Sequence, residues 1–180
     1  MEGEKFDGNR PLFQEPPDDL GPESYHGFLL GGMAAYDEFQ VARSYRQAGD
    51  AVIDAALKDA DLSYEWVYPA FFLYRHALEL YLKLIVRPTK PTHSLSKLVK
   101  SFKNIVRREL RLEIPSWALD RLKEIADIDP GSTSFRYSDV LLTNKLACRG
   151  EWWVEFGHLK QLMNCLFDGI EKAYWARGKH

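Results

Sequence analysis

Apolar residues recur every three or four positions along most of the chain after residue 32, which is the spacing of amphipathic helices. The first stretch runs from Met33 to Lys58 and is followed by "DADLS", a short polar segment. Its apolar positions are Ala35, Phe39, Ala42, Val52, Ala55 and Ala56. We therefore predict a first helix between about Met33 and Lys58.

The most apolar stretch ends at Val86 and predicts a second helix at the centre of the core. Asp61 or Ser63 is suited to cap its start, because a short polar side chain accepts hydrogen bonds from the free N–H groups there. Pro69 either opens this helix or kinks its first turns, since proline is tolerated only near a helix N-terminus. The segment "RPTKP" at residues 87–91 ends it.

Three further helices are expected along the rest of the chain. The third begins after Thr92 or Ser94, the fourth follows Pro115, and the last covers about residues 157–176. Between the last two, residues 135–156 are rich in aromatic and branched side chains around a glycine, which predicts a small hairpin or an ordered loop. The predicted fold is all-α, a bundle of about five helices with this one excursion.

The N-terminal residues 1–31 differ in composition from the rest. They contain four prolines and several glycines, so we expect a flexible arm or one draped over its own domain. Residues 32–180 show no repeat and no second apolar core, and are expected to form a single helical domain.

Overall charge and cysteine content narrow the function classes. The 180 residues carry a formal net charge of −2, so nothing draws the whole molecule to nucleic acid or anionic lipid, and any such binding must be local. Cys148 and Cys165 lack metal-ligand spacing and are too few for a disulfide framework, which indicates a reducing compartment. The five histidines are scattered, and the chain has no phosphate-binding glycine loop and no His-Glu-x-x-His motif, so no metal or other cofactor is expected. No apolar run reaches the roughly 18 residues of a membrane span, and the polar N-terminus is unlike a signal peptide. We expect a cytoplasmic protein without membrane contact.

Four ionisable residues interrupt the second helix: Arg75, His76, Glu79 and Lys83, here called the polar stripe. At about 100° per residue they share one face, and apolar residues cover most of the remaining circumference, which indicates a partly covered seam. A ladder of salt bridges on a solvated face explains them at about 0.2–0.5 kcal/mol per pair. The alternative is an anion site, in which Arg75 and Lys83 bind the anion and Glu79 holds the guanidinium.

The segment "YRHALELYLKLIV" at 74–86, a short loop and then "THSLSKLVKSF" at 92–102 resemble the HEPN superfamily, small helical domains of prokaryotic toxin and defence systems. The later "SFRYSDV" at 134–140 is similar to an aromatic-Arg-Tyr segment of some members. The resemblance covers residues 68–102 well and 135–140 loosely. It implies a bundle that forms homodimers and acts in a defence or toxin–antitoxin setting, with a partner protein encoded nearby.

In its catalytic branch the resemblance implies a metal-independent endoribonuclease, whose Arg is followed by His after four to six residues. Only Arg87 and His93 have this spacing here, and the two prolines between them place the pair in a loop. The sequence therefore departs from the family's ribonuclease motif.

Metal-free RNA cleavage needs a base for the 2′-hydroxyl proton and a cation for the charge that develops on phosphorus, roles that suit histidine and arginine or lysine. We expect the domain to contact RNA or a nucleotide at the polar stripe. His93 or His76 suits the base, and Arg75, Lys83 or Arg136 suits the cation. The candidate catalytic residues are His93, Arg75 and Glu79, and the candidate binding residues are His76, Lys83, Arg136 and Tyr137.

Structural roles explain several of the same residues. His93 suits packing beside or capping the third helix, and Arg136 with Tyr137 suits an arginine–aromatic stack that fixes a loop. At the level of the whole domain, the alternatives are a non-catalytic dimerisation or protein-interaction module, and a small-molecule sensor with an apolar cavity between helices.

Overall fold

The computed structural model describes Pro11, Phe13 and residues 37–58, 63–130, 132 and 153–178. Its contacts divide the chain into two units, Met1–Ala35 and Tyr36–His180. The arm expected at residues 1–31 lies outside the described residues, apart from Pro11 and Phe13. So does almost all of the hairpin or loop expected at 135–156, of which residues 153–155 have no regular structure and Phe156 begins the last helix.

Helices account for most of the described part of the second unit. They are α1 (Glu38–Lys58), the 3-10 turn η3 (Ser63–Trp66), α2 (Val67–Val86), α3 (Leu95–Arg108), α4 (Ser116–Ile128) and α6 (Phe156–Arg177). Five α-helices and no strand within these ranges confirm the predicted all-α bundle.

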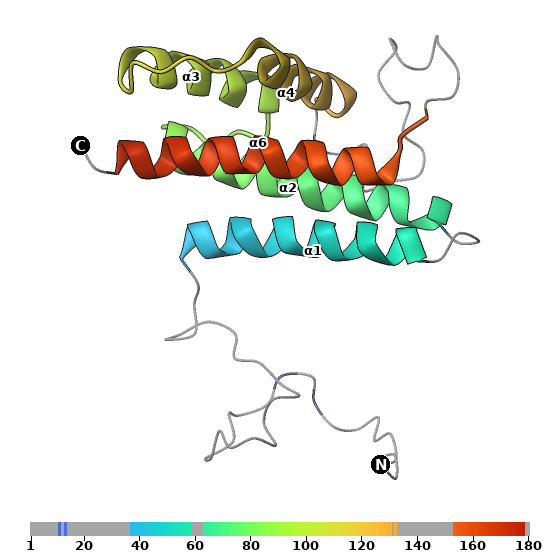
Figure 1. Cartoon of the computed structure of the whole chain (residues 1–180). Helices are drawn as coiled ribbons and strands as arrows, with labels where there is room; N and C mark the ends of the chain where they lie inside the picture. Colours follow the sequence, from blue (N-terminus) through green and yellow to red (C-terminus); the bar gives the residue numbers. More distant parts are fainter. Residues whose placement is uncertain are drawn as a thin grey trace. The chain divides into compact units, whose positions relative to one another are not determined.

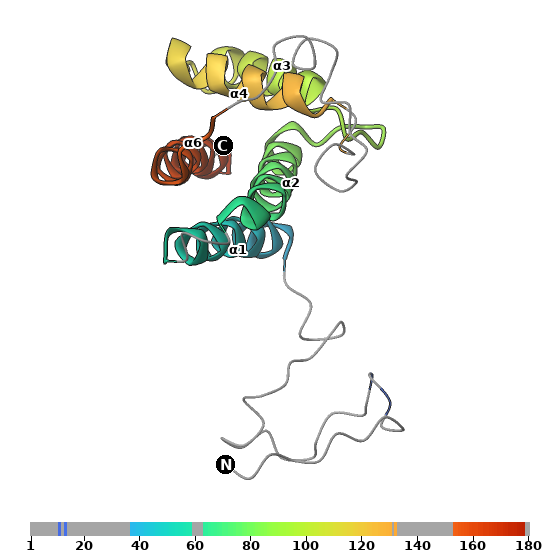
Figure 2. The same ribbon diagram turned by 90° about the vertical axis from the view of Figure 1, so that its right-hand side faces the viewer.

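The helices of the second unit form three layers with α2 in the middle one (Figure 1). The view turned by 90° shows α1 on one side of α2 and the α3–α4 pair on the other, with α6 beside α2 (Figure 2). Contacts of α2 with α1, α3 and α6 confirm its central place. This position explains why its sequence is apolar around most of its circumference.

Helix ends follow local side-chain chemistry. Of the two predicted caps of α3, Thr92 and Ser94, the structure uses Ser94, whose hydroxyl accepts a hydrogen bond from the N–H of Lys97. Pro69 lies in the first turn of α2, where its missing N–H costs nothing. The predicted side-chain cap of α2 is wrong for Ser63: the N-cap is Trp66, which makes no such bond, because η3 already leads the backbone into the helix.

One close approach fixes the packing of α1 on α2. A Cβ atom added at Gly49 would lie 2.7 Å from two ring carbons of Tyr74, closer than carbon atoms pack. The absence of a side chain at residue 49 therefore lets the buried ring of Tyr74 sit directly against the α1 backbone.

Candidate functional site

The polar stripe of α2 leads into a buried network centred on Arg75, whose side chain is only 2% exposed. Its Nε lies 2.9 Å from Asp129 Oδ2. Its Nη1 donates to Glu79 Oε2 at 3.0 Å and to Ser132 Oγ at 2.8 Å. The backbone oxygens of His93 and Asp129 accept from Nη2 at 3.0 and 3.2 Å. All five N–H groups of the guanidinium are therefore used inside the protein.

Glu79 is the second centre of this network and is 1% exposed. One carboxylate oxygen accepts from Arg75, and the other lies 2.7 Å from Lys83 Nζ and 2.8 Å from His93 Nδ1. Burial alone would raise the pKa of this carboxyl, but the hydrogen bonds from Lys83, Arg75 and His93 outweigh it and hold the pKa below its usual value. Glu79 is therefore an ionised carboxylate that only accepts hydrogen bonds.

His93 joins the buried carboxylate to the surface. Its side chain is 66% exposed, and Nδ1 faces Glu79 Oε1. Because an ionised carboxylate has no hydrogen to donate, Nδ1 carries the hydrogen of this bond, and the neutral ring then presents Nε2 as a proton acceptor. Lys83, which is 29% exposed, brings an ammonium group to the same carboxylate oxygen. The result is an exposed imidazole oriented by a buried carboxylate beside a cation.

The structure brings together four of the residues singled out from the sequence: Arg75, Glu79, Lys83 and His93. The salt-bridge ladder is present, but it is buried rather than solvated. His76 lies outside the network. Its ring packs edge-on against Tyr45 of α1, with ring centroids 4.4 Å apart.

His76 stands at the edge of the polar stripe, rotated on the helix by about 100° from Arg75 and about 60° from Glu79. Its ring faces α1 there, which the contact with Tyr45 shows. Arg136 and Tyr137 are outside the described residues.

Asp129 and Ser132 were not singled out from the sequence. Both are buried, at the end of α4 and just beyond it, and Ser132 has a positive φ of 60°. The segment "DPGSTS" at residues 129–134 has the composition of a turn. Nothing in its spacing indicates that two of its polar side chains meet Arg75, more than fifty residues earlier in the chain.

A second polar network joins α1, α2 and α6. Arg46 of α1 bonds Asn164 Oδ1 at 2.8 Å, Asp168 Oδ1 at 2.7 Å and Glu171 Oε1 at 3.1 Å. Tyr81 of α2 donates to Glu171 Oε1 at 2.5 Å. Burial is the main cause that raises the pKa of Tyr81, and the hydrogen bond to the Glu171 carboxylate is the second, so the hydroxyl stays protonated.

The same network continues along α1. Tyr74 donates to Asp50 Oδ1 at 2.7 Å, and Asn164 donates to the same oxygen at 2.8 Å. Lys160 pairs with Asp54 one turn further. The sequence does contain a pattern that indicates this network. Polar residues are spaced by four on α1, at 46, 50 and 54, and on α6, at 160, 164 and 168. Since the partners satisfy one another, this network stabilises the helix packing rather than offering a site.

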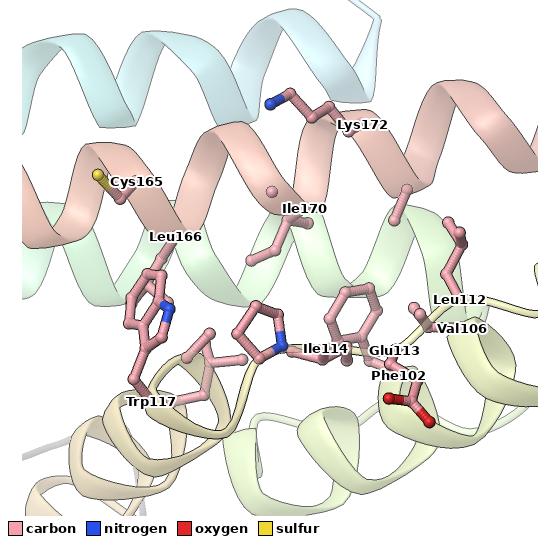
Figure 3. A pocket seen from close by; sticks show the side chains of 15 residues that line it. Phe102, Val106, Leu112, Glu113, Ile114, Trp117, Cys165, Leu166, Ile170 and Lys172 are labelled. Atoms are coloured by element: carbon pink, nitrogen blue, oxygen red, sulfur yellow. The ribbon is translucent and has the colours of Figure 1, made fainter.

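An apolar cavity of about 220 Å³ lies between α3, α4 and α6 (Figure 3). Phe102, Leu122 and Ile170 line its inner part, and the exposed side chains of Leu112 and Trp117 lie at its rim. The sensor interpretation requires a cavity of this kind. It contains no histidine, and its charged lining residues are Glu113 and Lys172.

No protein-family model, no curated protein and no solved structure matches this chain. The described ranges hold no cluster of three or more His, Cys, Asp or Glu side chains suited to a metal ion. Within the same ranges, no helix combines the length and apolar character needed to cross a membrane.

Proposed function

We propose that this domain binds RNA and cleaves it without a metal ion, with His93 as the general base. The observation that carries the proposal is the contact between the exposed His93 ring and the buried Glu79 carboxylate, 2.8 Å from Nδ1 to Oε1. A carboxylate that fixes one ring nitrogen leaves the other directed to accept a proton, which is the usual arrangement of a histidine base.

The chemistry follows from these groups. His93 Nε2 takes the proton of a 2′-hydroxyl, and the 2′-oxygen attacks the adjacent phosphorus. The bond from phosphorus to the 5′-oxygen breaks, and the leaving oxygen takes a proton from water. The products are a 2′,3′-cyclic phosphate and a 5′-hydroxyl. Lys83, held beside the histidine through Glu79, stabilises the negative charge that develops on the phosphoryl oxygens.

Arg75 has a positioning role in this scheme. It holds the Glu79 carboxylate and the backbone oxygen of His93, so it fixes both partners of the pair. With all five of its N–H groups engaged, it has none to donate to a substrate. Of the two cations expected from the sequence to bind the anion, Lys83, the more exposed one, takes this role in the proposal.

The test is cleavage of a fluorescently labelled single-stranded RNA in EDTA by the wild type, His93→Ala and a matched control, His158→Ala. His158 is exposed and makes no side-chain contact with the Arg75 network. We expect His93→Ala to lose on the order of 100-fold or more of the rate, the usual contribution of a general base, and His158→Ala to keep it. Melting temperatures should change little, because the His93 ring is mostly exposed and Arg75 and Lys83 still bond the Glu79 carboxylate.

Two further measurements complete this test. The cleaved fragment should carry a 2′,3′-cyclic phosphate, and an RNA with 2′-deoxy residues should resist cleavage. Full activity of His93→Ala, or no cleavage by the wild type, would refute the proposal.

The setting of this activity is part of the proposal. The resemblance to HEPN domains supports a cytoplasmic homodimer that acts in a prokaryotic defence or toxin–antitoxin system, opposed by a protein encoded nearby. Light scattering of the purified chain tests the dimer, and toxicity on expression that depends on His93 tests the toxin role.

A non-catalytic interaction module is the second candidate. It is favoured by the exposed Leu112 and Trp117 at the rim of the apolar cavity, where a second copy of the chain could bury them. Under this alternative, Trp117→Ala dissociates the dimer, while no variant of His93 changes any activity. RNA cleavage by the wild type and by His93→Ala separates the two candidates, because only the first predicts an activity that His93→Ala loses; sedimentation of Trp117→Ala tests the interface.

A further inference from the structure

Charge is segregated along the chain in a way that the net value hides. From Leu80 to Arg108 there is no Asp or Glu, whereas the whole chain carries a formal charge of −2. The cations of this stretch are Lys83, Arg87, Lys90, Lys97, Lys100, Lys103, Arg107 and Arg108. The stretch that contains His93 is therefore strongly basic, and the rest of the molecule is acidic.

On α3 these cations form a continuous exposed surface, here called the basic face, made of Lys97, Lys100, Lys103, Arg107 and Arg108. At about 100° per residue the five fall within an arc of about 140°. The buried residues Leu95, Leu98, Phe102 and Val106 occupy the opposite side. From Lys97 to Arg108 the basic face extends about 17 Å along the helix.

The basic face has no acidic partner within the described residues. None of its five side chains forms an ion pair or hydrogen bond there, whereas the cations Arg46, Arg75, Lys83, Lys160 and Arg177 all do. Glu109, the first acidic residue after this stretch, is held by Arg177 at 3.0 Å. Within that part of the chain, no acidic side chain occupies the cations of the basic face.

This arrangement of like charges lowers the stability of α3. Surface helices intersperse charges of both signs, because opposite charges three or four residues apart stabilise a helix by about 0.2–0.5 kcal/mol and like charges destabilise it by similar amounts. Lys97–Lys100, Lys100–Lys103 and Lys103–Arg107 are all like-charge pairs at these spacings. An anionic partner that binds along α3 removes this repulsion.

The basic face begins beside the proposed catalytic site. His93 directly precedes the N-cap of α3, and Lys97 follows it by four residues. We propose that the basic face binds the phosphate backbone of the RNA strand and leads it to His93. This inference rests on the proposed function for the identity of the polyanion.

Phosphate contacts determine a binding constant that falls steeply with salt. For single strands the logarithmic slope is about −0.7 per phosphate neutralised, so removing three lysine contacts should reduce the slope by about 2. On the same relation, affinity at 0.1 M salt should fall on the order of 100-fold. The loss should be similar for RNAs of different sequence, because backbone contacts carry no base information.

The experiment measures fluorescence anisotropy of a labelled single-stranded RNA across a salt series, with the full chain in a His93→Ala background so that the RNA stays intact. The test variant is Lys97→Gln/Lys100→Gln/Lys103→Gln. The matched control, Arg43→Gln/Lys58→Gln/Lys172→Gln, removes three exposed cations from α1 and α6 and changes the net charge equally.

We expect the test variant alone to lose affinity and salt slope. Equal losses in both variants, or none in the test variant, would overturn the inference. Displacement of the RNA by poly-glutamate at equal charge concentration would also overturn it, because the basic face would then be a docking surface for acidic protein. Cleavage by the wild type is measured separately, so an intact cleavage activity with unaltered RNA binding refutes the basic face and leaves the role of His93 standing.

Discussion

Replacing Arg75 with methionine removes five hydrogen-bond donors from the centre of the fold while keeping an unbranched side chain in place. The change leaves the Asp129 carboxylate without the guanidinium that it contacts at 2.9 Å, and both residues are only 2% exposed. It also frees one oxygen of Glu79 and the backbone oxygen of His93. Breaking a buried ion pair by removing one partner costs about 3–5 kcal/mol, because an uncompensated charge stays buried.

For a chain of this size each kcal/mol corresponds to about 2–4 °C in melting temperature, so Arg75→Met should melt roughly 6–20 °C lower. Arg121→Met is the matched control, because it breaks a pair with Glu124 in which both side chains are more than 40% exposed. Its cost should stay below about 1 kcal/mol. Far-UV circular dichroism measures the melting temperature on heating and the free energy of unfolding in urea for both variants.

Equal, small losses for Arg75→Met and Arg121→Met would refute the reasoning. They would mean that water reaches the network and screens its charges. A second readout separates positioning from folding. At a temperature where Arg75→Met remains folded, it should cleave RNA more slowly, and Arg75→Lys should recover part of the rate by restoring a donor near Glu79.

The remaining predictions concern packing and pH. Gly49→Ala should destabilise the fold by about 1–3 kcal/mol because its Cβ meets the Tyr74 ring, whereas Gly169→Ala, with nothing within 4 Å, should stabilise it by about 0.5–1 kcal/mol; urea titration tests both. Glu79 has a lowered pKa in the folded protein, so its stabilisation is complete above about pH 4.5 and is lost as the pH falls below that value; Glu79→Gln should flatten this acid limb of the stability curve. Tyr81 has a raised pKa, so its stabilisation is present below about pH 10 and is lost above it; Tyr81→Phe should flatten the alkaline limb.

Local chemistry made the helices predictable. The cap at Ser94, the place of Pro69 and the end of α2 at Val86 depend on neighbours within a few residues, which the sequence displays directly. The start of α1 was less accurate. It begins at Glu38, where Asp37 accepts a hydrogen bond from the N–H of Gln40 at 2.7 Å, and not near Met33.

The candidate site was predictable only in part. The spacing of Arg75, Glu79 and Lys83 by four indicated that they meet on one face, and their contacts confirm it. Whether that face is solvent-exposed or buried depends on Asp129 and Ser132, which contact Arg75 through tertiary packing. Helical periodicity carries no information about such contacts.

The partners of the α2 tyrosines were also not predicted. The rings of Tyr74 and Tyr81 belong to the apolar part of α2, but their hydroxyls do not. Buried tyrosine hydroxyls need partners, and Asp50 and Glu171 supply them. A search for polar residues spaced by four on other predicted helices would have found these partners.

His93 is held by two hydrogen bonds, one at its backbone and one at its ring, and this links the proposed site to the stability of the fold. Arg75 holds its backbone and Glu79 holds its ring, so the residue is tied at two points to the innermost helix. Both contacts come from side chains that are themselves buried in the interior. Heat, acid or a core mutation that loosens the interior should therefore abolish the proposed cleavage in step with unfolding, so that no partly unfolded state keeps the activity.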